Sequence, residues 1–161
     1  MTSFSKAALS ALLAVSTTLT VASFGAPTAQ ASAFSEADEA VEYRQHAFQL
    51  IRQNFGYMAG MVRGEIDFDG DMFEQRAQAL AHLSNIPWDG FKYAGHNYSG
   101  SGDAKAEIWQ NQADFEQRAR QLQEDAKKLA QAATSHDIGE IRGAFMSTAR
   151  NCQQCHEQYR D

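Results

Sequence analysis

The residues of this chain with the most specific chemistry form the run Cys152-Gln153-Gln154-Cys155-His156 near the C-terminus. Two cysteines three positions apart lie on one face of a helix, so both sulfurs can meet the two vinyl groups of one porphyrin. The histidine that follows can place an imidazole nitrogen on the iron from the same side. This C-x-x-C-H spacing predicts one covalently attached c-type haem, with His156 as the axial iron ligand.

Other functions of a cysteine pair fit these residues less well. A thioredoxin-like C-x-x-C begins a helix after a strand, whereas this pattern ends a helix in a helical chain. A zinc site needs about four ligands, and only His156 accompanies the two cysteines. Exported proteins often form disulfides, but a bond between positions i and i+3 late in a helix would constrain little. A redox thiol or a small structural protein without haem therefore stands as the alternative from a different class.

The N-terminal segment predicts a signal peptide over residues 1–31. A single lysine precedes an apolar stretch at 7–22, and small residues suited to cleavage follow, with cleavage after Ala31 or Ala33. The apolar stretch is too short and too interrupted by Ser and Thr for a membrane anchor. We expect an exported, periplasmic domain over 32–161 with no membrane anchor.

Composition bounds the partners of that domain. The whole chain has 14 basic and 20 acidic residues. Removal of the signal with its single lysine leaves 13 against 20, a net charge near −7. The absence of a basic patch argues against nucleic-acid binding. The remaining length corresponds to one ordinary domain.

Apolar residues recur at spacings of three and four, which predicts helices. The expected N-caps are Ser35 and Asp103, Gly64 ends the first helix, and a glycine-rich loop covers 89–103. Short connections make the first pair and the last pair antiparallel neighbours. The predicted fold is all-α, an up-down-up-down antiparallel four-helix bundle with haem near the C-terminal end of the last helix. The predicted helices cover 36–63, 71–84, 104–133 and 137–159.

The first helix should supply the residues opposite the haem iron. In this topology its first half lies at the level of His156, and its inward residues there are Val41, Arg44 and Phe48, none of which is a usual iron ligand. Met58 lies about 15 Å further along the helix and is more typical of a core position. We expect a five-coordinate iron with a crowded, apolar distal side, and an anion such as a haem propionate as the partner of Arg44.

Several short motifs carry a resemblance across nearly all of the predicted mature domain. The chain resembles the cytochromes c′, which are class II c-type cytochromes with a C-terminal haem site. The haem motif is the strongest match. The supporting matches are Tyr43-Arg44-Gln45, Asn54-Phe55-Gly56, Gly64, Leu83-Ser84-Asn85-Ile86-Pro87-Trp88, Gly102-Asp103-Ala104, Glu107-Ile108-Trp109 and Tyr159-Arg160.

The resemblance implies a left-handed four-helix bundle, often a homodimer, with high-spin five-coordinate haem that binds nitric oxide and carbon monoxide. It also implies one-electron redox chemistry with redox partner proteins. No feature of the chain indicates a substrate pocket, so we expect a protein that is not an enzyme. The alternative is a low-spin electron-transfer class II cytochrome c.

The resemblance also assigns residues around the haem. The position of Phe48 carries the bulky distal residue in the family, and in low-spin relatives a methionine ligates iron from this position. Arg44, Gln45 and Asp103 match positions at the haem edge and propionates. Arg160 matches a basic residue near the proximal histidine.

Overall fold

The computed structural model describes residues 33–92 and 102–161. The expected signal peptide over 1–31 lies outside these residues, as does the part of the expected loop at 93–101. The described residues belong to one compact unit, Ala31–Asp161. Its helices are α1 (Ala37–Arg63), α2 (Gly70–Leu83), the 3₁₀ helix η1 (Pro87–Phe91), α3 (Glu107–Gln110), α4 (Gln112–Ala133) and α5 (Ile138–Tyr159).

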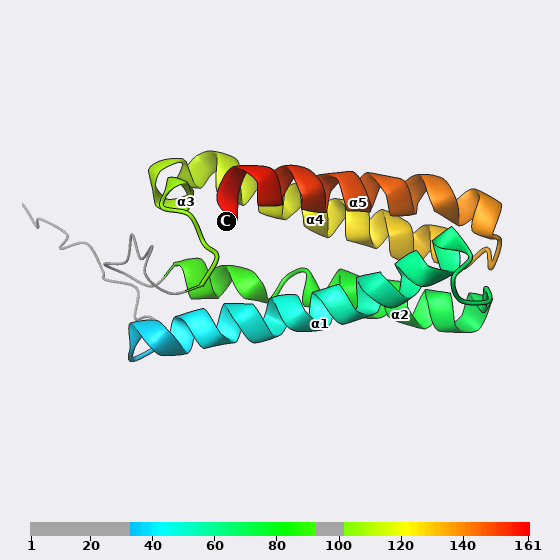
Figure 1. Cartoon of the computed structure of the whole chain (residues 1–161), viewed down its shortest axis with the longest axis horizontal. Helices are drawn as coiled ribbons and strands as arrows, with labels where there is room; N and C mark the ends of the chain where they lie inside the picture. The colour runs from blue at the N-terminus through cyan, green and yellow to red at the C-terminus, as the bar shows by residue number, and fades with distance from the viewer. Residues whose placement is uncertain (1–32, 93–101) are drawn as a thin grey trace, which may run out of the picture. The chain divides into compact units, whose positions relative to one another are not determined.

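The four long helices of this unit alternate in direction along the chain (Figure 1). Helix α1 packs against α2, α2 against α4, and α4 against α5. The described residues form no strand, and none of their helices is long and apolar enough to cross a membrane. The prediction of an all-α, up-down-up-down four-helix bundle is confirmed.

The helix ends follow local capping rules, with one difference from the prediction. The N-cap of α1 is Glu36 and not Ser35, because Glu36 and Glu39 form a reciprocal capping box. Gly64 ends this helix in the left-handed region, at φ 74°, where a glycine has no Cβ penalty. The side chain of Asp137 accepts the backbone N–H groups of the first turn of α5, which fixes where that helix starts.

The predicted helix at 104–133 is wrong at its N-terminal end. The chain forms the short α3, breaks at Asn111 (φ −124°, ψ 45°) and continues as α4. Asp103 therefore caps no helix. Residues 103–105 instead run beside the C-terminus, because Ala104 forms a bridge with Arg160 and the Asp161 N–H donates to the Asp103 carbonyl at 2.9 Å.

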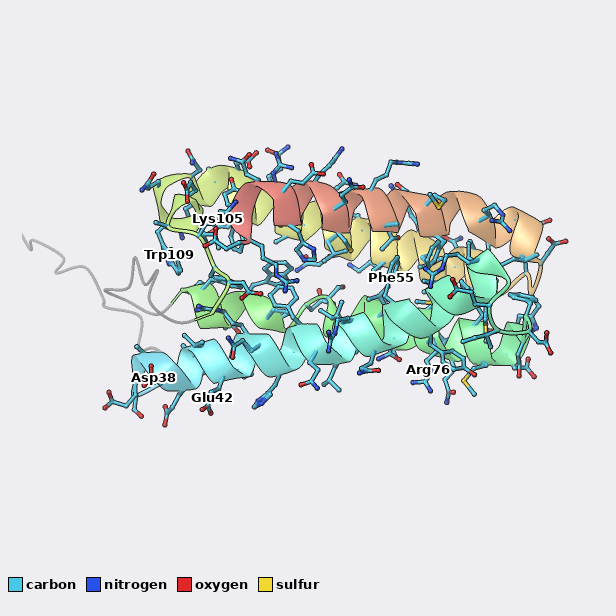
Figure 2. All side chains as sticks on the ribbon, viewed as in Figure 1. Asp38, Glu42, Phe55, Arg76, Lys105 and Trp109 are labelled. Carbon is cyan, nitrogen blue, oxygen red and sulfur yellow. The ribbon has the colours of Figure 1, made fainter. Side chains whose placement is uncertain are left out.

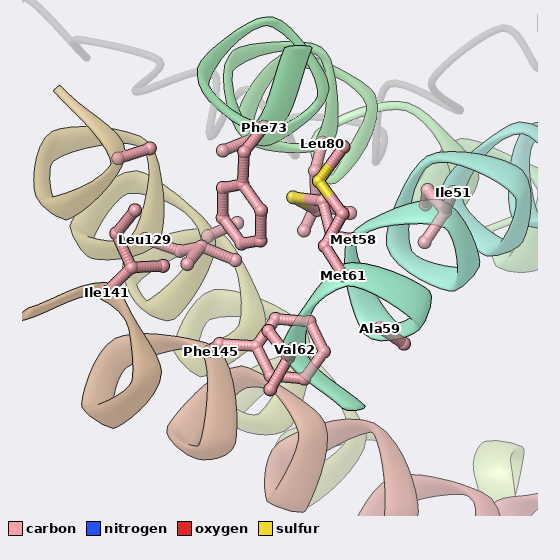
Figure 3. Packing of buried hydrophobic residues seen from close by; sticks show 13 residues of the cluster. Ile51, Met58, Ala59, Met61, Val62, Phe73, Leu80, Leu129, Ile141 and Phe145 are labelled. Carbon is pink, nitrogen blue, oxygen red and sulfur yellow. The ribbon is translucent and has the colours of Figure 1, made fainter. Parts of the chain in front are cut away.

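A closed core of apolar side chains fills the half of the bundle that contains the α1–α2 and α4–α5 connections (Figure 3). Phe55 of α1 points toward the other helices (Figure 2) and stacks on Phe145 of α5, with ring centroids 4.6 Å apart. Burial of this much apolar surface is the main stabilising contribution to such a fold. The buried members are Ile51, Met58, Ala59, Met61, Val62, Phe73, Ala77, Leu80, Ala126, Leu129, Ala133, Ile141 and Phe145.

The other half of the bundle has a smaller cluster, which we call the aromatic end. It joins η1, α3, α4 and the last turns of α5, and the C-terminal end of α5 lies beside α3 (Figure 1). Helix η1 lies so close to α1 that a Cβ on Gly90 would be 2.6 Å from the Ala40 carbonyl oxygen. The aromatic end consists of buried Ile108, Phe115 and Tyr159, with partly buried Trp88, Phe91, Ala104, Trp109 and Cys155.

Candidate functional site

The cysteine pair lies in the last two turns of α5, on the side that faces the bundle. Thr148, one turn earlier on the same stripe, is fully buried, and Cys152 and Cys155 are half-buried free thiols. Cys155 packs against the aromatic end. The two sulfurs therefore share one partly covered helix face, as the spacing predicted.

The electrostatic surroundings of the cysteines disfavour the thiolate. Burial, as the largest cause, raises the pKa of the Cys152 thiol to about 11, and burial also raises the pKa of Cys155. Reactive redox cysteines have lowered pKa values, because the thiolate is the nucleophile. The site is therefore suited to cysteines held as neutral thiols or thioethers and poorly suited to thiol–disulfide exchange.

His156 lies at the surface of α5, immediately after the cysteine pair. Its pKa is lowered, first because partial burial disfavours the imidazolium and second because of the positive charge of Arg160. Neutral imidazole is the form that ligates a metal ion. The chain therefore offers a histidine in the ligating form one position beyond two thiols.

Arg44 is the clearest sign that the aromatic end is incomplete by itself. The side chain is 4% exposed, its Nη1 donates to the Gly90 carbonyl at 3.0 Å, and its guanidinium carbon lies 4.6 Å from the centre of the Phe91 ring. Its Nη2 has no hydrogen-bond partner within the described residues. A buried donor without a partner costs about 1–3 kcal/mol, and a carboxylate is the usual partner of a guanidinium. A haem propionate would supply that anion, so the residues present fit a haem.

One other buried side-chain nitrogen in the described ranges has no partner, Nε of Arg76. Arg76 is only half-buried, and its Nη1 donates to Asn54 on the α1–α2 side of the bundle. That nitrogen therefore belongs to a different surface and indicates nothing about the aromatic end.

The structure brings the other residues predicted at the haem edge to the same end of the bundle. Asp103 accepts two hydrogen bonds from Arg160, at 2.9 Å from Nε and 2.6 Å from Nη2, in an exposed ion pair. The Gln45 side chain of α1 lies against Gly102, whose φ of 84° also favours glycine. Asp103 and Arg160 were predicted separately, as a haem-edge and a proximal residue, and their pairing was not predicted.

Phe48 lies between the closed core and the aromatic end. It is half-buried, packs against the closed core, and makes edge contacts with Trp88 and Phe91 at centroid distances of 5.8 and 6.2 Å. Sequence reasoning missed these two aromatic neighbours, since both come from η1, about forty residues further along the chain.

The model of the family described as Cytochrome C' matches residues 39–160. This chain belongs to the cytochrome c′ family. A cytochrome c′ from Alcaligenes xylosoxydans xylosoxydans is 35% identical over 127 residues, which cover 79% of this chain and 97% of that protein.

Solved structures agree with the family assignment. The cytochrome c prime from Shewanella frigidimarina is 44% identical, with a TM-score of 0.75 over 80% of this chain and 98% of that chain. Two variants of the cytochrome c prime from Alcaligenes xylosoxidans, one in a nitric oxide complex and one with carbon monoxide bound, are each 34% identical. Their TM-scores are 0.71, over 80% of this chain and 98% of theirs. Like the other cytochromes c′, the chain carries a covalently bound haem c.

Proposed function

We propose that this cytochrome c′ is a periplasmic protein that binds nitric oxide and carbon monoxide at a high-spin, five-coordinate haem and exchanges single electrons with redox partner proteins. The haem supplies the open iron coordination position and the one-electron couple. The protein binds gas and carries electrons, and it is not an enzyme. The observation that carries the proposal is the buried guanidinium of Arg44, whose Nη2 has no hydrogen-bond partner within the described residues, at the same end of the bundle as the C-x-x-C-H motif.

The chain holds the haem from α5. Cys152 and Cys155 would form the two thioether bonds, and His156 would ligate the iron. Their half-buried face next to the aromatic end supports this arrangement. Arg160, whose positive charge already disfavours the imidazolium of His156, lies on the same proximal side.

The chain holds the haem edge from α1 and from the segment before α3. Arg44 would donate to a propionate through its unpaired Nη2, and its guanidinium lies over the rings of Phe91 and Trp109. Gln45 and Asp103 lie close to the same edge. The Asp103–Arg160 ion pair then links the propionate side of the site to its proximal side.

Phe48 covers the distal side. A phenyl ring cannot coordinate iron, and it excludes water from the distal position. Trp88 and Phe91 support the ring from the side, so a gas has to displace a packed side chain. The relatives with bound nitric oxide and carbon monoxide support gas binding here. Homodimer formation, which is frequent in the family, is part of the same proposal.

The covalent attachment is tested by replacement of both cysteines with alanine. The Cys152→Ala, Cys155→Ala protein should lose all its haem on acid–acetone extraction, whereas the unmodified protein keeps it. Gln154→Ala, an exposed position inside the motif, is the matched control and should keep the haem. Retention of haem by the double variant would disprove the assignment.

The low-spin electron-transfer cytochrome is the competing function. Electron paramagnetic resonance of the ferric protein separates the two, because a five-coordinate haem gives high-spin signals and a six-coordinate methionine-ligated haem gives low-spin signals. Phe48 at the distal position favours the high-spin result. A resting low-spin signal would replace the proposed function with this alternative.

A further inference from the structure

Asp125 is a buried carboxylate on the α4 face that packs against α5. It is 6% exposed, next to the fully buried Ala126. Within the described residues it forms no ion pair with Lys, Arg or His. A buried charge without a counter-ion is costly, so its retention needs specific hydrogen bonds.

Two amide side chains supply those bonds. The Gln121 amide donates to Oδ1 at 3.0 Å, and the Asn151 amide donates to Oδ2 at 3.4 Å. An amide nitrogen donates and does not accept, so both carboxylate oxygens act as acceptors. The Asp125 carboxylate is thus hydrogen-bonded at both oxygens inside the protein.

The position of this anion relative to the haem attachment point follows from Asn151. This residue directly precedes Cys152 on α5, so its hydrogen bond ties the Asp125 carboxylate beside the first cysteine. Asp125 is among the negative charges that raise the pKa of the Cys152 thiol, after the larger effect of burial. The carboxylate therefore acts electrostatically on the attachment point.

We propose that Asp125 is an electrostatic control of the haem: a buried negative charge beside Cys152 that lowers the reduction potential. Reduction transfers one electron from a one-electron donor to ferric iron, which gives ferrous iron and removes one positive charge. A fixed anion stabilises the more positive ferric state, and low surrounding dielectric strengthens the effect. The inference rests on the proposed attachment of haem at Cys152.

The test compares reduction potentials of haem-loaded full-length variants. Asp125→Asn removes the charge with little change of shape, and Glu124→Gln removes the same charge from the adjacent, exposed position of α4. At a fixed applied potential the ferrous-to-ferric ratio should rise on the order of tenfold in Asp125→Asn, which is about 59 mV for a one-electron couple. Glu124→Gln should change the ferrous-to-ferric ratio much less. Its effect, unlike that of Asp125→Asn, should vanish at high salt.

A second uncharged variant separates the effect of the charge from a folding defect. Asp125→Leu also removes the buried charge, with an apolar group in its place, and it should raise the potential in the same direction. If Asp125 only ties α4 to α5, both variants lower the unfolding temperature and leave the potential equal to that of Glu124→Gln, which overturns the inference. Failure of the proposed haem attachment would give a different result, because haem would then be extractable from the unmodified protein.

Discussion

The closed core and the aromatic end occupy opposite halves of the same bundle and differ in what completes them. The closed core consists of apolar side chains from all four long helices, several of them fully buried, and the chain fills it alone. The aromatic end contains the half-buried Cys155 and lies against the buried guanidinium of Arg44, whose Nη2 has no partner within the described residues. The chain alone completes the closed core, whereas in the proposed function the haem completes the aromatic end.

This difference explains why both halves belong to one short domain. A helix bundle holds its cofactor between facing helices, and packing in the closed core positions those helices relative to one another. Stacking of Phe55 on Phe145 joins α1 to α5 in the closed core. It thereby fixes the two helices that carry Phe48 and Cys152 on opposite sides of the proposed haem.

Loss of the haem should have the largest effect on stability, and this effect should be confined to the aromatic end. The Cys152→Ala, Cys155→Ala protein should lose about 4 kcal/mol or more of stability, the contribution of a ligand at roughly a thousand times its Kd. Hydrogen exchange should show protection lost around Arg44 and at the end of α5 but retained in the closed core. Equal thermal stability of the haem-free and haem-loaded proteins would remove the distinction between the halves.

Truncation inside the closed core should cost stability without changing the haem. Phe73 is fully buried and packs edge-on against Phe145, with ring centroids 6.4 Å apart. Phe73→Ala should lower the free energy of unfolding by about 3–5 kcal/mol, measured by denaturant titration, and leave the optical spectrum unchanged. A changed haem spectrum would mean that the halves are not independent.

Truncation of Phe48 should instead change gas binding at the haem. Phe48→Ala removes the ring that blocks the distal side, so carbon monoxide should bind more than tenfold faster, a barrier change of more than about 1.4 kcal/mol. Flash photolysis or stopped flow measures this rate. Phe48→Met should shift the haem toward a six-coordinate, low-spin state.

Phe55→Leu is the matched control, since it changes an aromatic residue two turns further along α1 in the closed core. It should lower stability and leave carbon monoxide binding unchanged. Unchanged kinetics in Phe48→Ala would refute the distal role of the ring.

A small pH dependence of stability should arise at the far end of the closed core. His136, at φ 51°, lies 2.7 Å from Glu74 through Nε2 and 3.5 Å from Asp71 through Nδ1. The hydrogen bond with Glu74 is the main cause of the raised pKa of His136, and the charge of Asp71 raises it further. Because the folded pKa exceeds the unfolded value near 6.5, this stabilisation is full below that value and is lost as pH rises through the folded pKa.

The free energy of unfolding, measured from about pH 5 to pH 9, should therefore depend less steeply on pH in Glu74→Gln than in the unmodified protein. The haem site should be unaffected, because the pair connects the α4–α5 turn to the start of α2. An identical slope in the variant would assign the pH dependence to other groups.

Local signals predicted most of this fold, and long-range contacts account for what they missed. The apolar stripes and the predicted stop at Gly64 placed the long helices, and the C-x-x-C-H spacing indicated the proposed attachment site. The break at Asn111 and the pairing of Asp103 with Arg160 were not predictable. They depend on the C-terminus lying beside residues 103–105, which are distant in sequence.

The candidate site was predictable to a similar extent. Helical periodicity placed Arg44 and Phe48 on the inward stripe, and the structure confirms that Arg44 is buried and Phe48 half-buried. Their neighbours Gly90, Trp88 and Phe91 come from a short 3₁₀ helix, which has no periodic signature at five residues. The buried position of Asp125 was also missed, because a carboxylate gives no sign in the sequence that it faces another helix.

The optical spectrum of the ferrous protein, with and without carbon monoxide, tests the central claim most directly. That claim is that a haem held by Cys152, Cys155 and His156 completes the aromatic end and leaves its distal side to Phe48. A covalent haem c with a high-spin spectrum that shifts on addition of carbon monoxide is the predicted result. A low-spin spectrum that carbon monoxide does not change, or no covalent haem at all, would contradict it.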